Sequence, residues 1–267
     1  MADTFDATTH WDALRERMEK GGPREVARYV LEFEPDERKA LFSFAQKSFA
    51  RKDWLGKSFD GLIDVVQTGI DDALTLANQS TDPEKAWKWT EHANILAFNL
   101  SADLCECWPG DDVPRERHHL ETGLRLGEKS VRWRRELGKP PERRALAYWV
   151  VGMHHLSLGQ THEALGAWVT ASGLATADRE AAGLPHRVEP GGDFAVILYA
   201  GYVGLARIAV GDAAGRAAYE AACRAFEETV ARIPDKKDDA QFGLDQLRHV
   251  ERKFVGTGPG ATSSTRP

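Results

Sequence analysis

Apolar residues recur at helical spacing along most of this chain, between breaks made by proline and glycine. From residue 59 to 78, for example, Leu62, Val66 and Ile70 repeat every four residues, which places them on one face of an α-helix. No stretch alternates apolar and polar residues over the length of a strand. The pattern therefore predicts an all-α fold of antiparallel helical hairpins, built as an α-solenoid or a compact α-α superhelix.

Local signals set the expected helix boundaries. Asp82-Pro83-Glu84 is a strong start signal, because the Asp can cap the helix and Pro fits its first position. Thr9 and Asp12 have the spacing of a capping box. Helices are expected over residues 9–20, 23–33, 35–49, 59–78, 83–107, 114–137, 194–210, 214–232 and 238–254, with a helical hairpin over 145–172 and a loop over 181–192.

Length and charge limit the classes of function. The chain has 267 residues, enough to bury a sizeable core, and its 35 Lys and Arg against 41 Asp and Glu leave a formal net charge of −6. A mildly acidic balance is atypical of proteins that follow a phosphate backbone. The basic stretch from Arg132 to Arg144 lacks an aromatic platform and is interpreted as a solvated helix end and loop. We therefore expect no nucleic-acid partner.

Cysteine usage and hydropathy bear on the compartment. Cys105, Cys107 and Cys223 are an odd number, and the first two are too close for ordinary bridging, so no disulfide framework is expected. Residues 1–6 are acidic and lack the apolar stretch of a signal peptide. The longest apolar run, 194–210, is shorter than a bilayer span. We expect a reducing, cytoplasmic location and no membrane contact.

The helical pattern predicts one domain over residues 1–255. Within it, the helices over 9–78 could form a capping subdomain. The remaining residues, 256–267, are Gly, Ser, Thr, Pro and other small or polar types that cannot build a core, so a disordered tail is expected.

The hairpin over 145–172 has the most specific pattern in the chain. Tyr148, Gly152 and His155 are spaced along its first helix, and Ala164 and Trp168 follow on its second. The small residues fit where two helices approach closely, and the aromatic side chains fill the space beside them.

These residues resemble the tetratricopeptide repeat, clearest over 145–176, with His155 in place of an aromatic residue. A weaker copy over 197–232 has Gly204 as its anchor, with Ala217 and Ala221 as later small residues after a one-residue slip. The two Gly anchors are farther apart than the family period of about 34 residues. An inserted loop over 176–192 accounts for the excess.

The resemblance implies that the first helix of each pair lines a concave face for a partner peptide. The corresponding positions are Trp87, Asn94, Phe98, Leu146, Trp149, Met153, Leu156, Leu198, Leu205 and Ile208. This face is mostly apolar, so the partner would be a helix or peptide with an apolar side. Other helices of the same chain could instead cover it, because a large exposed apolar surface is costly. Oligomeric state is left open.

Two alternatives to a non-catalytic protein-binding scaffold stay open. A small-molecule or peptide sensor, or an enzyme, would hold its ligand in a pocket near Trp149, Met153 and His155. A module that assembles with itself or in a larger complex would expose an apolar stripe around Phe42, Phe44 and Phe49. No Gly-x-Ser-x-Gly elbow or phosphate loop supports catalysis.

Histidine and cysteine pairs invite a metal interpretation that the sequence does not favour. Adjacent histidines such as His118 and His119 point about 100° apart on a helix, so a pair seldom chelates one ion. Glu116 and His119 match half of a di-iron bundle pattern, which needs a second Glu-x-x-His motif. Cys105 and Cys107 are interpreted as buried thiols. No metal or other cofactor is expected.

Overall fold

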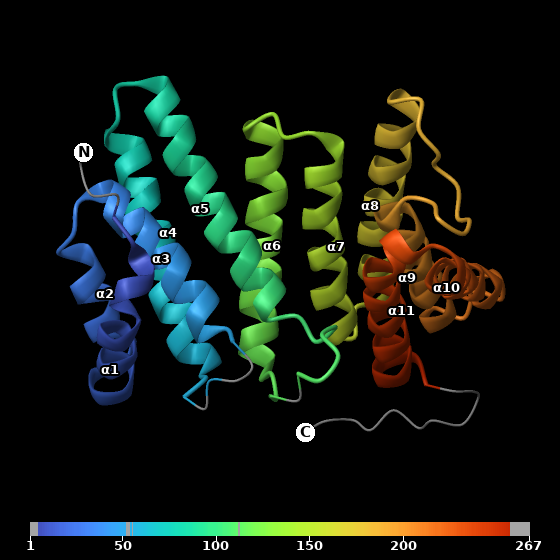
Figure 1. The fold of residues 1–267 in the computed structure, drawn as a ribbon, viewed down its shortest axis with the longest axis horizontal. Coiled ribbons are helices and arrows are strands. Elements are labelled where there is room, and N and C mark those ends of the chain that lie inside the picture. The colour runs from blue at the N-terminus through green and yellow to red at the C-terminus, as the bar shows by residue number, and fades with distance from the viewer. Residues whose placement is uncertain (1–4, 52–53, 55, 112, 257–267) are drawn as a thin grey trace. The chain divides into compact units, whose positions relative to one another are not determined.

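The computed structural model describes residues 5–51, 54, 56–111 and 113–256 and confirms the all-α prediction (Figure 1). Within these ranges the chain forms eleven α-helices and no strand. Helices α1 to α11 span Trp11–Gly21, Pro23–Leu31, Pro35–Phe49, Phe59–Gln79, Pro83–Asp103, Arg117–Glu136, Pro141–Ser157, Thr161–Ala181, Phe194–Ala209, Ala214–Arg232 and Lys237–Val250. Two 3-10 turns, Ala7–His10 (η1) and Pro234–Lys236 (η2), and a π-helical turn, Glu251–Val255 (η3), complete the elements.

The helices divide into two compact units by their contacts. Unit 1 comprises residues 1–104 and 114–139, and unit 2 comprises residues 105–113 and 140–267. Within each unit, helices adjacent in sequence pack on one another, as in α4 with α5 and α7 with α8. The single-domain prediction for 1–255 stays a prediction, and the expected disordered tail lies outside the described residues except for Gly256.

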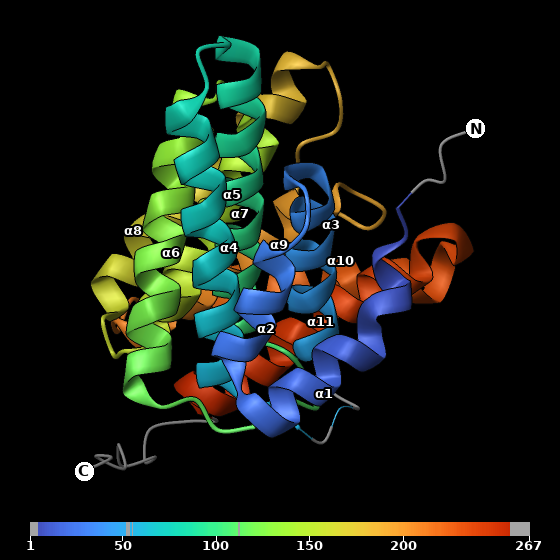
Figure 2. The ribbon, with the colours of Figure 1, turned by 90° about the vertical axis from the view of Figure 1, so that its left-hand side faces the viewer.

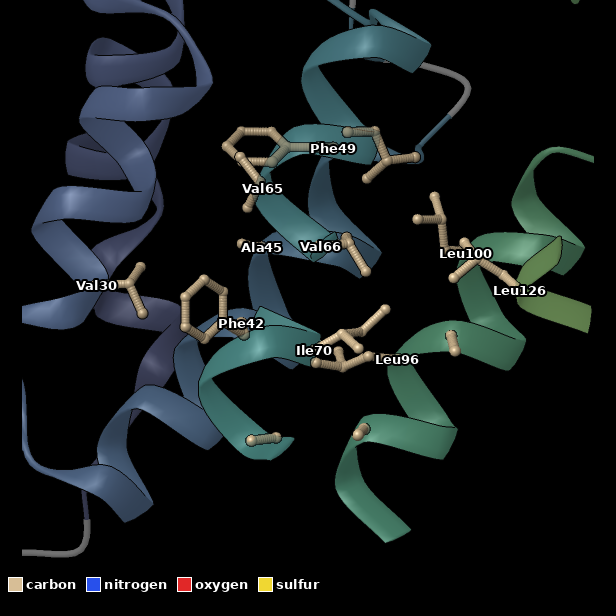
Figure 3. Close-up of a cluster of buried hydrophobic side chains, with 14 of the residues drawn as sticks. Val30, Phe42, Ala45, Phe49, Val65, Val66, Ile70, Leu96, Leu100 and Leu126 are labelled. Carbon is tan, nitrogen blue, oxygen red and sulfur yellow. The ribbon is translucent and has the colours of Figure 1, made fainter. Parts of the chain in front are cut away.

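The core of unit 1 forms where α3, α4 and α5 meet. Phe42, Ile70 and Leu96, one from each helix, are almost completely buried in one apolar cluster (Figure 3). Gly69 permits this close approach, because a Cβ there would lie 2.8 Å from the Phe42 ring and 3.1 Å from Leu96. Burying one such large side chain contributes about 1.5–3 kcal/mol to folding.

Buried hydroxyl groups join α5 to α6 in unit 1. Ser101 Oγ donates to the Gly123 carbonyl at 2.7 Å, and Ser130 Oγ donates to Asn94 Oδ1 at 2.8 Å. Both serines are fully buried. Each bond satisfies polar atoms that would otherwise be costly to remove from water.

The N-terminal helices do not expose the apolar stripe that a self-assembling module would need. Phe42 and Phe49 are each 1% exposed, and Phe44 is half-buried against Trp11 of α1. Helices α1 and α2 cover this side of α3 and α4 (Figure 2). Phe42, Phe44 and Phe49 therefore do not form the exposed apolar stripe that would have favoured the self-assembly alternative.

In unit 2, α7 and α8 form the predicted hairpin, and its close contact is confirmed. A Cβ on Gly152 would lie 2.3 Å from Trp168 Nε1, so the indole packs directly on the glycine. Trp168 is fully buried, and its Nε1 donates to the Trp149 carbonyl at 3.0 Å. Ala164 is also fully buried in this hairpin.

The second hairpin, α9 with α10, repeats this contact with different residues. A Cβ on Gly204 would lie 2.5 Å from the Tyr219 backbone nitrogen, and one on Gly215 would lie 2.8 Å from the Gly204 carbonyl oxygen. Gly215 and Tyr219 thus occupy the crossing, whereas the expected Ala217 is exposed and Ala221 half-buried. The prediction of Ala217 and Ala221 was wrong because a backbone contact this close requires a residue without Cβ.

Several boundaries differ from the sequence predictions. The capping-box prediction at Thr9 was wrong: Asp6 caps the first turn by accepting from Thr8 N, and α1 begins only at Trp11. Helix α5 ends at Asp103 rather than near Cys107. Helix α8 continues to Ala181, so only the second part of the segment 176–192 is a loop. The Asp82 cap is confirmed, since its carboxylate accepts from Glu84 N at 2.9 Å.

Replacing Gly152 tests the helix crossing. We expect Gly152→Ala to lower the free energy of unfolding by about 1–3 kcal/mol, because the fully buried Trp168 indole cannot move away from the new methyl group. The matched control is Gly166→Ala on α8, where a Cβ meets nothing within 4 Å. Gly166→Ala should raise the free energy of unfolding by about 0.5–1 kcal/mol, because alanine has the higher helix propensity. Urea denaturation measures both, and equal effects would contradict the crossing.

Burial of His92 predicts acid-sensitive stability. Desolvation, assisted by Lys39, lowers the pKa of His92 to about 4, and the side chain is 3% exposed beside Trp89. In the unfolded chain the pKa of His92 is near 6.5, so the unfolded chain binds the proton more strongly. The free energy of unfolding is therefore unaffected by this group above about pH 6.5 and decreases as the pH falls below that value. Between about pH 7.5 and 4.5 we expect this effect to lower the free energy of unfolding by about 2.5 kcal/mol, and we expect no such decrease from this position in His92→Leu. Urea denaturation of both proteins measures it, and identical pH profiles would contradict the assignment.

Candidate functional site

An apolar cavity of about 370 Å³ opens in unit 2 among α7, α9, α11 and the segment that precedes α6. Its lining residues are Trp108, Glu142, Arg143, Leu146, Trp149, Phe194, Ala195, Leu198, Tyr199, Phe242 and Gln246. The volume is near the lower end of the about 300–1,000 Å³ typical of small-ligand sites. The cavity therefore suits one large side chain or a small organic group.

Aromatic rings in mutual contact build the wall. Trp108 meets Trp149 edge-on, with ring centroids 5.9 Å apart, and stacks on Phe242 at 6.2 Å. Phe194 also stacks on Phe242, with ring centroids 6.5 Å apart. Trp149 is 5% exposed and Phe242 is 47% exposed. The cavity thus has a buried wall and an accessible apolar rim.

Helix phase explains why these residues meet. Pro141 opens α7, and Leu146 and Trp149, three positions apart, share one face of it. Asp193 caps α9 by accepting from Ala195 N and Val196 N at 3.0 and 3.1 Å, which starts the helix at Phe194. Phe242 and Gln246 are one turn apart on α11.

Two residues of the lining, Trp149 through Nε1 and Gln246 through Oε1, have a buried polar atom without a hydrogen-bond partner among the described residues. Gln246 is 1% exposed, and its Nε2 lies 3.7 Å from Cys107 Sγ. Leaving a buried amide atom unpaired costs about 1–3 kcal/mol, which a hydrogen-bond donor placed in the cavity would recover.

Charges at this cavity are confined to its rim. Glu142 and Arg143 are exposed, and Arg143 Nε lies 3.3 Å from Glu142 Oε1. A solvent-exposed ion pair of this kind contributes little to stability. Its charges remain accessible to a ligand that enters the cavity.

Part of the predicted groove is present at the cavity and part lies in the core. Leu146, Trp149 and Leu198 line the cavity. Met153, Leu156 and Leu205 are 0%, 4% and 0% exposed, so the structure places them in the core of unit 2. Ile208 is half-buried. His155, expected beside a pocket or in the hairpin, hydrogen-bonds to Gln160 at 2.7 Å in the turn after α7.

The three predicted groove residues of α5 belong to unit 1. Trp87 is 43% exposed, with the Lys139 ammonium 4.4 Å from its ring centroid. Phe98 has the Arg134 guanidinium 4.0 Å from its ring centroid. Asn94 is 2% exposed and engaged by Ser130. Trp87 and Phe98 are thus covered by basic side chains, and Asn94 is held by a buried hydrogen bond.

Sequence reasoning missed the residues that complete the cavity, chiefly Trp108, Phe242 and Gln246. Trp108 follows the end of α5 in a Pro- and Gly-containing break, where an aromatic residue has no helical stripe to join. Phe242 lies outside the buried stripe of α11, which includes Leu244 and Leu247. The sequence signal that could have identified Phe242 was a large apolar residue outside the apolar stripe of its helix.

A second cavity in unit 2, of about 470 Å³, is a weaker candidate because its polar groups pair within the protein. It lies beside the loop before α9. Arg179 pairs with Asp193 at 3.4 Å, Thr229 Oγ1 accepts from Gly191 N at 2.8 Å, and Lys236 donates to the Gly191 carbonyl at 2.5 Å. These contacts involve Arg179, Asp193, Thr229 and Lys236 of the lining and hold the loop in place.

The thiols do not form an accessible nucleophile. Cys105 and Cys107 are buried, as predicted, and Cys223 is buried as well. Cys105 Sγ lies 3.6 Å from His154 Nε2, but both residues are at most 1% exposed. Burial also raises the pKa of the Cys223 thiol, which disfavours the reactive thiolate.

Comparison of the chain with protein-family models, with curated proteins and with solved structures finds no match. The site is therefore interpreted from its own geometry. None of the described helices combines the length and the apolar character needed to cross a membrane.

Replacing Gln246 tests whether its amide is unsatisfied in the free protein. We expect Gln246→Met to raise the free energy of unfolding by about 1 kcal/mol, because it removes a buried polar atom without a partner. The matched control is Gln46→Met: Gln46 is 2% exposed, and its Nε2 donates to the Leu96 carbonyl at 3.2 Å. That change should lower stability by about 1 kcal/mol. Urea denaturation measures both, and destabilisation by both substitutions would contradict the assignment.

Proposed function

We propose that this protein is a non-catalytic, TPR-like helical scaffold that binds a segment of another protein through the aromatic cavity of unit 2. The observation that carries the proposal is an apolar cavity with an exposed rim and a buried, unpaired amide in its lining. The two glycine-centred hairpins, at Gly152 and Gly204, support the family resemblance. Free, buried thiols are compatible with the proposed cytoplasmic location.

The lining defines the chemistry of the partner. Aromatic walls favour a large apolar side chain, because burial of such a group supplies most of the free energy of a peptide anchor. The unpaired Oε1 of Gln246 requires a donor, such as a backbone N–H beside that anchor. The rim charges of Glu142 and Arg143 can select among flanking residues, since they act at the entrance.

A small-molecule sensor is the second candidate, because the cavity volume falls within the range of small-ligand sites. Phe242 distinguishes the two. Its 47% exposure extends the apolar surface beyond the cavity, which suits a peptide that continues along the rim. An enclosed small molecule would not need this exposed surface.

The test selects peptides from a displayed library on the full chain and measures their affinity by the fluorescence of the tryptophans in the wall. We expect the selected peptides to share an aromatic or large aliphatic anchor. Phe242→Glu should weaken their binding about tenfold or more, because it places a charge at the apolar rim. The matched control is Val169→Glu on α8, an apolar residue with 49% exposure that does not line the cavity. It should leave binding unchanged.

Equal affinity for Phe242→Glu and the unchanged protein would rule out this cavity as the peptide site. If no peptide is enriched, and small apolar compounds protect the unchanged protein but not Phe242→Glu from thermal unfolding, the sensor candidate replaces the scaffold. Circular dichroism confirms that each variant is folded, since both substituted positions are exposed.

A further inference from the structure

Two exposed side chains and one buried side chain converge at a single point in unit 1. His118 Nε2 and His119 Nε2, from the first turn of α6, lie 2.7 and 3.0 Å from Asp60 Oδ1 in the first turn of α4. The side chains of Asp60 and His118 are 67% and 51% exposed. The helical angle between adjacent histidines did not predict this convergence, which depends on a third residue from another helix.

The donor set matches a borderline transition metal. One ligand atom from each of Asp60, His118 and His119 lies within 4.8 Å of the other two. Zinc bonds of about 2.0–2.1 Å place neighbouring donors of a tetrahedral site about 3.3 Å apart. Small side-chain movements would bring all three atoms to that spacing. Solvent can reach the fourth position, since two of the residues are exposed.

Glu116 supplies the support that metal-binding histidines usually have. Its Oε2 lies 3.4 Å from His118 Nδ1, on the side of the ring away from Asp60. A carboxylate there holds a proton on Nδ1, so a metal that displaces the Nε2 proton donated to Asp60 finds the Nε2 lone pair in place. His118 and Asp60 are therefore oriented as first ligands without rearrangement of the backbone.

His119 sets the strength of the site. Its Nδ1 accepts from Glu116 N at 3.0 Å, which places the proton of the neutral ring on Nε2. Coordination through Nε2 requires that proton to move to Nδ1. This breaks the hydrogen bond from Glu116 N to His119 Nδ1, and the Glu116 N–H must then donate to water. The positive ends of α4 and α6 also oppose a cation, and the carboxylates of Asp60 and Glu116 offset them. These opposing effects make the affinity modest.

We propose that Asp60, His118 and His119 bind a divalent transition metal of the zinc class, with Glu116 positioning His118. This site lies in unit 1 and is independent of the cavity proposed for partner binding. Carboxylate and imidazole ligands favour Zn²⁺ or Ni²⁺ over Mg²⁺, which prefers oxygen donors and retains its water.

Calorimetric titration of the full, tag-free chain with Zn²⁺ tests the proposal, with Mg²⁺ as the control ion. We expect one Zn²⁺ per chain, bound in the micromolar range, and no comparable heat from Mg²⁺. Asp60→Asn and His118→Gln should each weaken Zn²⁺ binding by about tenfold or more. His119→Gln should weaken it by a similar factor, although glutamine can keep the helix cap by accepting from Glu116 N.

The matched control is His162→Gln, an exposed histidine in unit 2. It should leave the affinity unchanged. Absence of 1:1 binding overturns the proposal, and so does binding that survives in the Asp60→Asn, His118→Gln double variant. Unchanged affinity in His119→Gln overturns the three-residue ligand set. None of these three results depends on whether the cavity of unit 2 binds a peptide.

Discussion

The contact between the Trp168 indole and the backbone of α7 is the constraint on which the candidate cavity depends. The ring lies against Gly152, where no side chain intervenes, and its N–H donates to the Trp149 carbonyl. This single side chain thereby sets both the separation of α7 from α8 and the position of Trp149. Trp149 also lines the cavity, so a packing contact inside the hairpin holds the backbone that carries one of the cavity's aromatic side chains.

Glycine also permits close contacts between other helices of the protein. Gly204 meets the backbone of α10, and Gly69 accepts the Phe42 ring in unit 1. In each case the missing Cβ lets a backbone or a ring occupy space that any larger residue would fill. At Gly69, Gly152 and Gly204, close packing compensates for the low helix propensity of glycine.

Some buried polar groups of this protein are hydrogen-bonded within the chain, and others are not. Asn94, Ser101 and Ser130 hydrogen-bond across α5 and α6 and thus hold the fold. Gln246 has one amide atom without a partner beside an open apolar cavity. That unpaired atom is one of the observations behind the proposed peptide site.

Helical periodicity, Pro and Asp start signals and the small residues of the hairpin determined the fold class, most helix boundaries and the crossing at Gly152. Those features are local, because they depend on residues within one or two turns of each other. The cavity and the Asp60–His118–His119 cluster depend on residues far apart in sequence: Trp108 with Phe242, and α4 with α6. Local spacing cannot specify such pairs, since they meet only after the helices have packed. Burial of Met153 and Leu205 was likewise decided by tertiary structure, because an apolar helix face packs in the same way against a partner or against its own chain.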